Sequence, residues 1–526
     1  MFIRLYRFLA TYTNPPAFLS AATLALLFVA FAIPYNDLFA GFFGMVGTAT
    51  FIYFGWFYVA AVSGLLVFLL WVALSRYGSL RLGADDEEPA YTTPTWFAML
   101  FAAGIGTILM FWGVAEPLSH FANPPLSDVE PQSADAARLA MTTALYHFGL
   151  HTWTIFTMPA LAIAWFTYRK GLPMRISSIF HPWLGDRVYG RIGRVIDVIA
   201  LIGTLFGVAV SMGLGALQLN SGLNSVFGVE VATSSQIILI IVATLIATVS
   251  AGLGLDRGIR RLSEVNIVMT IMIMLFVWVF GPSLLITSGI VQNFGSYMQN
   301  IVWMSFWTET YQATDWQQRW TIFYWAWTIS WAPFVGIFIA RISRGRTIRQ
   351  FVLGALGAPL LFTLIWFSVF GLAAMDQVMN ENPDLIAQVQ DDVSVALFGF
   401  LQGYPLFLLS SGFSLTVIMV FLTTSADSAA LVADQLASDE GQQSHVRLRI
   451  FWTLMLGTLA ATLLLGGGLP ALQNVITVMG FPFCILLVLM ALTLQKSLAT
   501  DQGLVRPRYL DPQQEQDVEA LDPSGL

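Results

Sequence analysis

Three tryptophans in the apolar run 323–341 are the residues whose type and spacing most clearly suggest a chemistry: Trp325, Trp327 and Trp331. Trp327 and Trp331 are four residues apart, so on a helix their rings share one face and point the same way. The face of an aromatic ring attracts a cation by about 0.5–2 kcal/mol. Trp331 lies deeper in the run than the tryptophans of an interfacial belt. We therefore expect an aromatic surface that holds a cationic group within a membrane.

A second aromatic run, 146–156, offers an opposite wall made of Phe148, Trp153 and Phe156. Trp153 and Phe156 are three residues apart and are neighbours on a helix. Three or four such rings can hold a quaternary ammonium group without a buried carboxylate. The alternative is ordinary packed or lipid-facing aromatic residues, which 17 Trp and 41 Phe make common for any single ring.

Hydroxyl groups cluster in another apolar run, where Thr424 and Ser425 stand close to Asp427. Polar groups deep in a span are costly unless they have partners. These hydroxyls, with free backbone carbonyls nearby, would make an oxygen cage for a small cation such as Na⁺. The alternative is that they bond back to carbonyls of their own helix. The glycine-rich segment 102–107 of a different span can supply the carbonyls, which favours the cation site.

Other kinds of chemistry find little support in the chain. His147 and His151 have the i, i+4 spacing of two metal ligands, but no Glu or Cys stands near them in the sequence, so we predict no metal site there. The single cysteine, Cys484, allows neither an internal disulfide nor a cysteine metal cluster. No serine-protease triad, zinc-protease or nucleotide-binding motif occurs, so we do not expect an enzyme.

The composition is that of a polytopic membrane protein. Of 526 residues, 57% are hydrophobic and 10% are charged, whereas a soluble domain has about 25% charged residues. The net charge of −7 and the scattering of basic residues over short loops argue against nucleic-acid binding. The first apolar run, 17–34, is longer than the core of a signal peptide, so we expect it to be retained as a helix.

The elements that position these residues are apolar runs of roughly 20 residues each. We count twelve spans, at about 17–34, 48–74, 94–117, 139–167, 195–227, 235–254, 265–288, 320–340, 351–374, 404–435, 450–467 and 472–495. Arginine and lysine concentrate in alternate loops, most densely in 341–349, which predicts that both termini are cytoplasmic. Segment 290–318 is expected to be an amphipathic helix on the outer surface.

We divide the chain into a cytoplasmic segment 1–16, a membrane domain 17–495 and an acidic, disordered tail 496–526. Glycines or proline interrupt the third span (Gly104, Gly106), the eighth (Pro333, Gly336) and the fifth. Breaks at membrane depth point to a transporter binding site. Because the third and eighth spans are five apart, they suggest two five-helix repeats of opposite topology after two leading helices. Close packing through small residues is the alternative.

Three of these runs carry a resemblance to a known family. The segments Met110–Pro117, Trp325–Phe334 with Ile339–Arg346, and Thr424–Ser428 resemble motifs of the betaine/choline/carnitine transporter (BCCT) family. The similarity extends from about the first span to the twelfth. It implies an all-α protein with twelve helices, two inverted five-helix repeats of the LeuT-like kind (helices 3–7 and 8–12) and usually a trimer in the bacterial inner membrane.

The resemblance also implies roles for particular residues. The substrate path would be lined by Phe148, Trp153, Phe156, Trp327, Thr328 and Trp331, beside Gly104 and Gly106. The carbonyls of Ala102, Ile105 and Phe421 and the hydroxyls of Thr424 and Ser425 would hold Na⁺. The family commonly has tryptophan at the positions of Phe148 and Thr328 and tyrosine at that of Phe156, so this chain would form a smaller, less aromatic cage.

The function expected from these features is secondary active uptake of a betaine-like zwitterionic or quaternary ammonium solute, such as glycine betaine, choline, carnitine, ectoine or a sulfur analogue. Na⁺-coupled symport is the first hypothesis, with Na⁺ as coupling ion and no other cofactor. An ion-independent exchanger of the same family is the alternative, although Thr424 argues against it. A second Na⁺ site implied by some relatives would fall on Val208 and Phe156, which lack side-chain oxygens, so we predict one Na⁺.

Overall fold

The computed structural model describes residues 2–501 except 105, 254–255, 313, 440–441 and 443, so the tail expected to be disordered lies almost wholly outside the described residues. The described part consists of helices and their connections, and its β-structure is an isolated bridge between Arg81 and Thr347. The α-helices are α1 (Phe2–Tyr12), α2 (Pro15–Ala32), α3 (Asn36–Leu74), α4 (Thr93–Gly104), α5 (Thr107–Ala122), α6 (Ala134–Phe148), α7 (Leu150–Ala164), α8 (His181–Leu184), α9 (Arg191–Phe227), α10 (Thr233–Leu253), α11 (Asp256–Phe280), α12 (Ser283–Ser305), α13 (Phe323–Arg341), α14 (Ile348–Asn380), α15 (Asp384–Asp391), α16 (Ala396–Leu401), α17 (Phe407–Leu436), α18 (Val446–Leu465) and α19 (Leu469–Ala499).

Among the described residues, ten helices are long and apolar enough to cross a membrane. They correspond to ten of the predicted spans. The other two, 94–117 and 139–167, coincide with the shorter helix pairs α4–α5 and α6–α7, each interrupted near its middle. The protein is thus a multi-pass, all-helical membrane protein, and its count of twelve spans stays a prediction.

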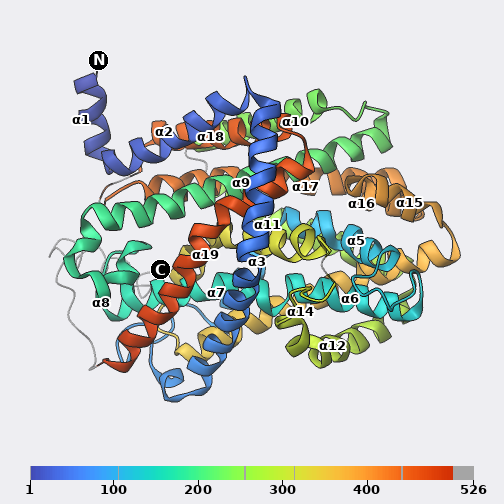
Figure 1. Ribbon diagram of the computed structural model, residues 1–526, viewed down its shortest axis with the longest axis horizontal. Helices are drawn as coiled ribbons and strands as arrows, with labels where there is room; N and C mark the ends of the chain where they lie inside the picture. Colours follow the sequence, from blue (N-terminus) through green and yellow to red (C-terminus); the bar gives the residue numbers. More distant parts are fainter. Residues whose placement is uncertain are drawn as a thin grey trace.

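Helix α13 lies at the centre of the bundle. It packs against α7, α9 and α19, while α17 lies along α9 and α18 along α10. Figure 1 shows α9, α17, α10 and α18 running roughly parallel, with α3 and α19 crossing them. The span that contains α13 has a mean hydropathy of only 1.5 but is 83% buried, whereas the span within α11 reaches 2.1 and is 28% buried. Protein, and not lipid, therefore surrounds the tryptophans of α13.

Two helix pairs are broken at glycine. Between α4 and α5, Gly106 is extended (φ −155°, ψ −177°), and between α6 and α7, Gly149 has φ −89° and ψ −130°. A Cβ at Gly149 would come within 2.3 Å of the Leu145 carbonyl and 2.9 Å of the Tyr297 hydroxyl, so only glycine fits there. The Tyr297 hydroxyl in turn accepts a hydrogen bond from the Leu150 N–H, which stabilises the first turn of α7 (3.0 Å).

The prediction of a matching break in the eighth span is wrong. Helix α13 continues through Pro333 to Arg341, and α9 is also a single helix. Their glycines instead permit close packing: a Cβ at Gly336 would lie 3.2 Å from Pro159, and one at Gly207 would lie 3.0 Å from Ser330. The small-residue alternative therefore describes these two spans, because Pro333 removes only one hydrogen bond from a helix that its neighbours enclose.

The seventh predicted span and the amphipathic segment after it also differ from the structure. Helix α11 ends at Phe280, because Gly281 and Pro282 stop it eight residues before the predicted boundary. Helix α12 then occupies Ser283–Ser305, so the residues that were expected to end one span belong to the next helix.

The arginine-rich segment after α13 is tied to the connection between α3 and α4. The Arg346 guanidinium lies 4.0 Å above the Trp96 ring, and Arg349 donates a hydrogen bond to the Ala73 carbonyl (2.9 Å). Arg81 donates to the Gly345 carbonyl (2.8 Å). These contacts fix the end of α13, and with it the row of residues that α13 presents to the bundle interior.

Candidate functional site

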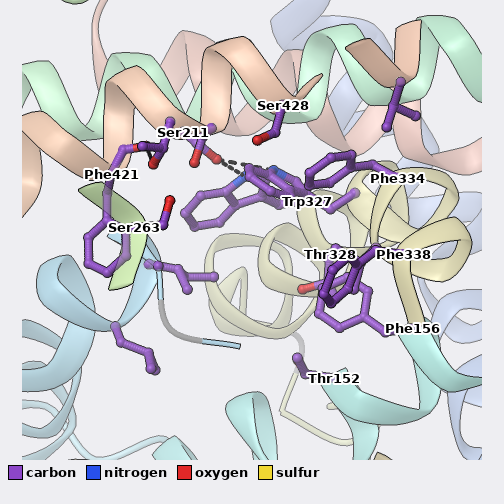
Figure 2. Close-up of a pocket in the computed structure, with 18 of the residues that line it drawn as sticks. Thr152, Phe156, Ser211, Ser263, Trp327, Thr328, Phe334, Phe338, Phe421 and Ser428 are labelled. Atoms are coloured by element: carbon purple, nitrogen blue, oxygen red, sulfur yellow. Dashed lines mark hydrogen bonds between the residues drawn. The ribbon is translucent and has the colours of Figure 1, made fainter. Parts of the chain in front are cut away.

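A cavity of about 440 Å³ lies between α13 and the helices around it (Figure 2). Six helices besides α13 contribute to its wall, namely α5, α7, α9, α11, α14 and α17, together with the last residue of α6. Along α13 the lining extends from Trp327 to Arg341, which on a helix is roughly 21 Å. The size is that of a small-molecule site.

The indoles of Trp327 and Trp331 are held by one hydroxyl. Both Nε1–H groups donate to Ser211 Oγ on α9, at 3.0 Å and 3.1 Å, and Trp327 also donates to the Gly207 carbonyl (3.1 Å). Figure 2 shows Ser211 above the indole with these bonds dashed. Gly207 allows α9 this close, because a Cβ there would be 3.0 Å from the Trp331 ring. The two rings are thus locked on one face of α13.

The opposite wall comes from the broken helix pair. Trp153 and Phe156 on α7 form an edge-to-face pair with ring centroids 5.6 Å apart, and Thr152 lies one residue before Trp153. Phe148, just before the break at Gly149, stacks on Phe367 (5.0 Å, 15°) and still lines the cavity. The break separates the direction of Phe148 from that of α7, so rings from both helices reach the same space.

None of the described residues that line the cavity is acidic. The polar lining consists of hydroxyls, one amide (Asn266) and Arg341, whose guanidinium donates to Gln435 Oε1 (2.9 Å). Asp427, which follows the hydroxyl cluster in sequence, does not line the cavity and lies 3.6 Å from Arg449. A cation in the cavity would therefore meet ring faces and hydroxyl oxygens instead of a carboxylate.

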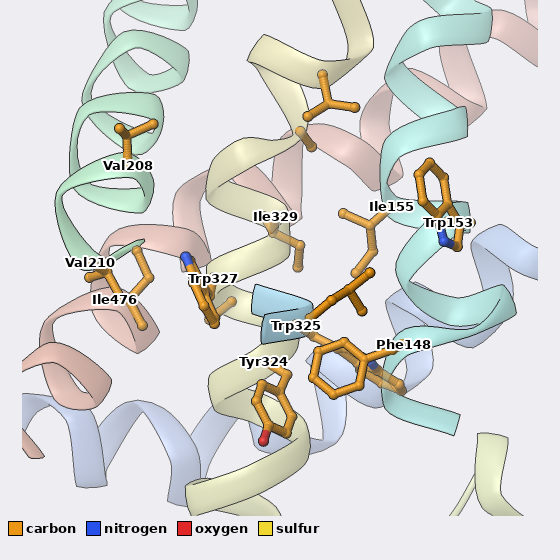
Figure 3. Close-up of a cluster of buried hydrophobic side chains, with 14 of the residues drawn as sticks. Phe148, Trp153, Ile155, Val208, Val210, Tyr324, Trp325, Trp327, Ile329 and Ile476 are labelled. Carbon is orange, nitrogen blue, oxygen red and sulfur yellow. The ribbon is translucent and has the colours of Figure 1, made fainter. Parts of the chain in front are cut away.

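The residues expected along the substrate path mostly meet at this cavity. Seven of them line it: Gly106, Phe148, Trp153, Phe156, Trp327, Thr328 and Trp331. Gly104 ends α4, and its surroundings lie outside what the structure describes. Trp325 turns to the other side of α13 and stacks on His151 (5.3 Å, 12°). Figure 3 shows Trp327 and Trp325 leaving α13 in opposite directions.

The residues expected to hold Na⁺ are brought together only in part. Phe421, Thr424 and Ser425 line the cavity. Ala102 lies in the last turn of α4, and Ile105 is outside the described residues. Thr424 donates its hydroxyl proton back to the Val420 carbonyl (2.8 Å), as the alternative interpretation has it. The lone pairs of that oxygen still face no other donor among the described residues, so the hydrogen bond and cation coordination are compatible.

Several lining residues were missed by the sequence analysis. Ser211, Ser263 and Asn266 come from α9 and α11, and Arg341 comes from the arginine cluster that was used only for topology. Ser211 lies between Gly207 and Gly213, and these glycines indicate an irregular or closely packed helix and not a side-chain role for the serine. No pattern in the sequence signals that α9 approaches α13 at this residue, since the approach depends on Gly207 and on the packing of the whole bundle.

The fold brings to His147 an acidic residue that does not stand near it in the sequence. Glu116 of α5 reaches His147, with Oε1 2.5 Å from Nδ1, and His120 lies beside it with Nε2 3.4 Å from the same oxygen. His151 belongs to a different environment, because its Nε2 bonds to Ser305 Oγ (2.9 Å). Sequence spacing could not reveal this cluster, since Glu116 is 31 residues from His147.

Comparison with known proteins agrees with the multi-pass membrane architecture. The sequence model of the betaine/carnitine/choline family of transporters matches residues 16–503. The glycine betaine transporter of Bacillus subtilis is 44% identical over 455 residues, which cover 86% of this chain and 88% of that protein. The ectoine/glycine betaine/proline transporter of Corynebacterium glutamicum is 42% identical over 459 residues, covering 86% and 74%.

The high-affinity choline transport protein of Escherichia coli K12 is 38% identical over 492 residues, or 93% of this chain and 72% of that protein. These relatives transport solutes and are not enzymes, which confirms the expectation that this protein is not one either. The match covers almost all described helices, including those that form the cavity, and confirms the resemblance found in the motifs. The chain therefore belongs to the betaine/carnitine/choline (BCCT) family of transporters.

Proposed function

We propose that the protein is a secondary active transporter that takes up a betaine-like zwitterionic or quaternary ammonium solute together with Na⁺. The observation that carries the proposal is the cavity whose wall holds two indoles on Ser211 and no described acidic residue. A fixed carboxylate would bind any cation, including Lys-like amines and metal ions. Ring faces instead favour a large, weakly hydrated cation such as trimethylammonium.

The N-terminal end of α5 could bind the anionic group of a zwitterionic solute. Gly106, Ile108 and Leu109 at its start line the cavity, and the N-terminus of a helix attracts an anion. The Leu109 and Met110 carbonyls are held by Trp366 Nε1 (3.1 Å) and Gln218 Nε2 (2.7 Å), which fix this turn. A solute with a carboxylate beside its ammonium group would fill both positions, so we place zwitterions before choline among the candidate substrates.

We place the coupling ion between the C-terminal end of α4 and the hydroxyl pair on α17. The last carbonyls of α4 lack partners within their helix and carry the negative end of its dipole. The hydroxyl oxygens of Thr424 and Ser425 stand on the cavity wall at α17. Na⁺ between them would explain why a broken helix and a hydroxyl pair occur in one site. We propose one ion, because Val208 and Phe156 offer no oxygen for a second.

The number of spans, the internal repeats and the orientation are also part of the proposal and rest on the family resemblance. We propose twelve membrane spans in which α4–α5 and α6–α7 act as single spans, with two inverted five-helix repeats after two leading helices. In this arrangement the arginine-rich end of α13 and both termini face the cytoplasm, and the cavity extends toward the cytoplasm. We also propose a homotrimer in the bacterial inner membrane. Cysteine-accessibility labelling of single-cysteine variants in the loops, and cross-linking in membranes, would test the orientation and the trimer.

Uptake assays in a transport-deficient bacterial host test the function. We expect accumulation of a labelled betaine-type solute that depends on external Na⁺ with a Hill coefficient near one. Glycine betaine, ectoine, proline, carnitine, choline and a dimethylsulfonium analogue form the panel, and the host with empty vector is the control. If none of these solutes is taken up, the proposal is overturned.

The same assay separates the alternative. An exchanger would accumulate solute only in cells or vesicles preloaded with a related solute, and replacing Na⁺ by K⁺ would not change its rate. Either result would refute Na⁺ symport while leaving the aromatic cavity as the binding site. A Hill coefficient near two would refute the single-ion proposal alone.

A further inference from the structure

Three side chains that take no part in the cavity meet in the interior between α5 and α6. Glu116 and His120 lie one turn apart on α5, and His147 comes from the last turn of α6. Their exposed fractions are 0%, 1% and 0%. One ligand-type atom from each, a carboxylate oxygen and two imidazole nitrogens, lies within 4.8 Å of the others. Two imidazoles and a carboxylate form the donor set of many zinc sites.

The hydrogen bonds of this cluster are incomplete. His120 Nδ1 has no hydrogen-bond partner among the described residues, and neither His120 Nε2, 3.4 Å from Glu116 Oε1, nor Oε2 of Glu116, whose carboxylate interacts with Tyr324, has one of good geometry. Buried polar atoms are almost always paired, and an unpaired buried histidine with a carboxylate next to it calls for a reason. A metal ion would satisfy His120 Nε2 and a Glu116 oxygen at once.

His147 is held in the orientation of a ligand. Its Nε2 is 2.9 Å from Thr321 Oγ1, in the π-helical turn η5 (Gln318–Ile322), and this bond directs Nδ1 toward Glu116. Metal-binding histidines commonly fix their second nitrogen in this way. The rings of Trp316 and Trp320 cover the cluster, with centroids 5.2 Å and 4.5 Å from that of His120, and exclude water from it.

The distances suit a small ion after a limited rearrangement. Ligands at about 2.0–2.1 Å from a tetrahedral Zn²⁺ are roughly 3.3 Å from each other. His120 Nε2 and Glu116 Oε1 are already 3.4 Å apart. His147 Nδ1 is 2.5 Å from the same oxygen, a hydrogen bond that the ion would replace. Binding the ion would require His147 Nδ1 and Glu116 Oε1 to move apart by roughly 0.8 Å.

We propose that Glu116, His120 and His147 bind a divalent transition-metal ion, Zn²⁺ in the first instance, and that the ion locks α5 to α6. His147 precedes Phe148, which lines the cavity, and in the proposed orientation the cluster lies between the cavity and the outside. A bound ion would therefore keep this end of the path closed and inhibit transport. The metal site itself does not depend on the identity of the solute or on the Na⁺ coupling.

Metal binding to the purified full-length protein tests the site directly. After removal of any histidine tag and of bound metal with a chelator, the protein is titrated with Co²⁺, whose visible absorption reports four- or five-coordinate nitrogen and oxygen ligands. We expect one Co²⁺ per chain, displaced by Zn²⁺. Loss of an outer-shell partner weakens metal binding about 10–100-fold, so removing a ligand in His120→Asn or Glu116→Gln should weaken it at least tenfold.

Two further variants keep the test decisive. His151→Asn removes a buried histidine one turn along, which bonds to Ser305, and should leave Co²⁺ affinity unchanged. Thr321→Val removes only the partner of His147 Nε2 and should weaken Co²⁺ binding about 10–100-fold even where a ligand variant does not fold. If the wild type binds no stoichiometric Co²⁺ or Zn²⁺, or if His120→Asn and Thr321→Val both bind Co²⁺ as tightly as the wild type, the proposal is overturned and the three residues form only a hydrogen-bonded cluster.

Inhibition of uptake gives an independent result. External Zn²⁺ should slow solute uptake by the wild type, and a chelator should reverse the effect. The Zn²⁺ concentration for half-maximal inhibition should be at least tenfold higher in His120→Asn. Each variant is compared with its own uptake rate without metal. Equal sensitivity of wild type and His120→Asn would place any zinc effect elsewhere in the protein.

Discussion

Two aromatic clusters lie close together in the bundle and differ in what their rings enclose. In the cavity, Trp327 and Trp331 stand on Ser211 around open space with no described acidic residue. In the other cluster, Trp316 and Trp320 pack against His120, which lies beside the Glu116 carboxylate, and that carboxylate already has the His147 imidazole as partner. Aromatic residues alone therefore do not mark a solute site. Open space and the absence of a fixed anion distinguish the first cluster, and the predictions below test that distinction.

The largest effect is expected from removing a ring of the cavity. Trp331→Leu, and separately Trp153→Leu, keeps an apolar side chain but removes a face that is worth about 2 kcal/mol for a desolvated cation, or roughly thirtyfold in affinity. Uptake at solute concentrations below KM should therefore fall by roughly thirtyfold while the protein still reaches the membrane. Trp331→Phe, which keeps a ring, is the control and should retain part of the activity. If both leucine variants transport normally, these rings serve only to pack the helices.

Next in size is the loss of an oxygen that the proposed Na⁺ site uses. A contact between a neutral oxygen and a charged group is worth about 1.5–3 kcal/mol. Thr424→Ala should therefore raise the Na⁺ concentration for half-maximal uptake about tenfold or more. Thr423→Ala is the matched control, since Thr423 bonds to the Met419 carbonyl and does not line the cavity. An unchanged Na⁺ dependence in Thr424→Ala would contradict the site.

A smaller effect is expected where the rings remain but lose their common support. Ser211→Ala removes the acceptor of the Trp331 N–H, while Trp327 keeps the Gly207 carbonyl. One neutral hydrogen bond is worth about 1 kcal/mol, so KM for the solute should rise roughly fivefold. Ser330→Ala, at a buried hydroxyl that bonds to Ala326 within α13, should leave KM unchanged. Equal effects of both variants would indicate general destabilisation.

Adding a ring should shift selectivity moderately. Thr328 and Phe156 both line the cavity (Figure 2), and Thr328→Trp would add a wall that a trimethylammonium group can contact. A partly exposed ring contributes about 0.5–1 kcal/mol, so we expect trimethylammonium solutes to gain roughly two- to fivefold over ectoine or proline in competition uptake assays. A uniform loss of uptake for all solutes would mean that the added ring only fills the space.

The smallest effect on solute affinity is expected in the second cluster. Trp316→Leu removes a ring stacked on His147 (5.7 Å, 26°) but none that lines the cavity. KM for the solute should change less than about twofold, since less than about 0.5 kcal/mol is at stake for a side chain away from the site. A KM increase as large as that of Trp331→Leu would remove the distinction between the two clusters.

The sequence predicts which face of a helix a residue occupies better than it predicts where a helix is interrupted. The spacing of Trp327 and Trp331 correctly predicts a shared direction, because helix periodicity is local and α13 is regular. Proline and glycine in the same helix suggested a break that does not exist, since neighbouring helices enclose Pro333 and use Gly336 for contact. Conversely, Gly149 at the second break lies against the Tyr297 hydroxyl, a contact with a residue that is distant in the sequence and that no local pattern reveals.

Residue partnerships across the bundle were also beyond local inference. Ser211 meets two tryptophans 116 and 120 residues away, and Glu116 meets a histidine 31 residues away. Most residues that the family motifs assign to the substrate path line one cavity in the structure, because such motifs record positions together with their context. They said nothing of the contacts that orient the rings, which arise from how closely α9 and α13 approach.

The short end of α6 has a mechanical consequence. Its last two residues have different surroundings. His147 bonds to Glu116 and Thr321, whereas Phe148 lines the cavity and stacks on Phe367. Neither can swing without displacing the other, because they share one peptide unit and the chain bends immediately after them at Gly149. A displacement of the Phe148 ring would therefore be transmitted through the shared backbone to the hydrogen bonds of His147 with Glu116 and Thr321.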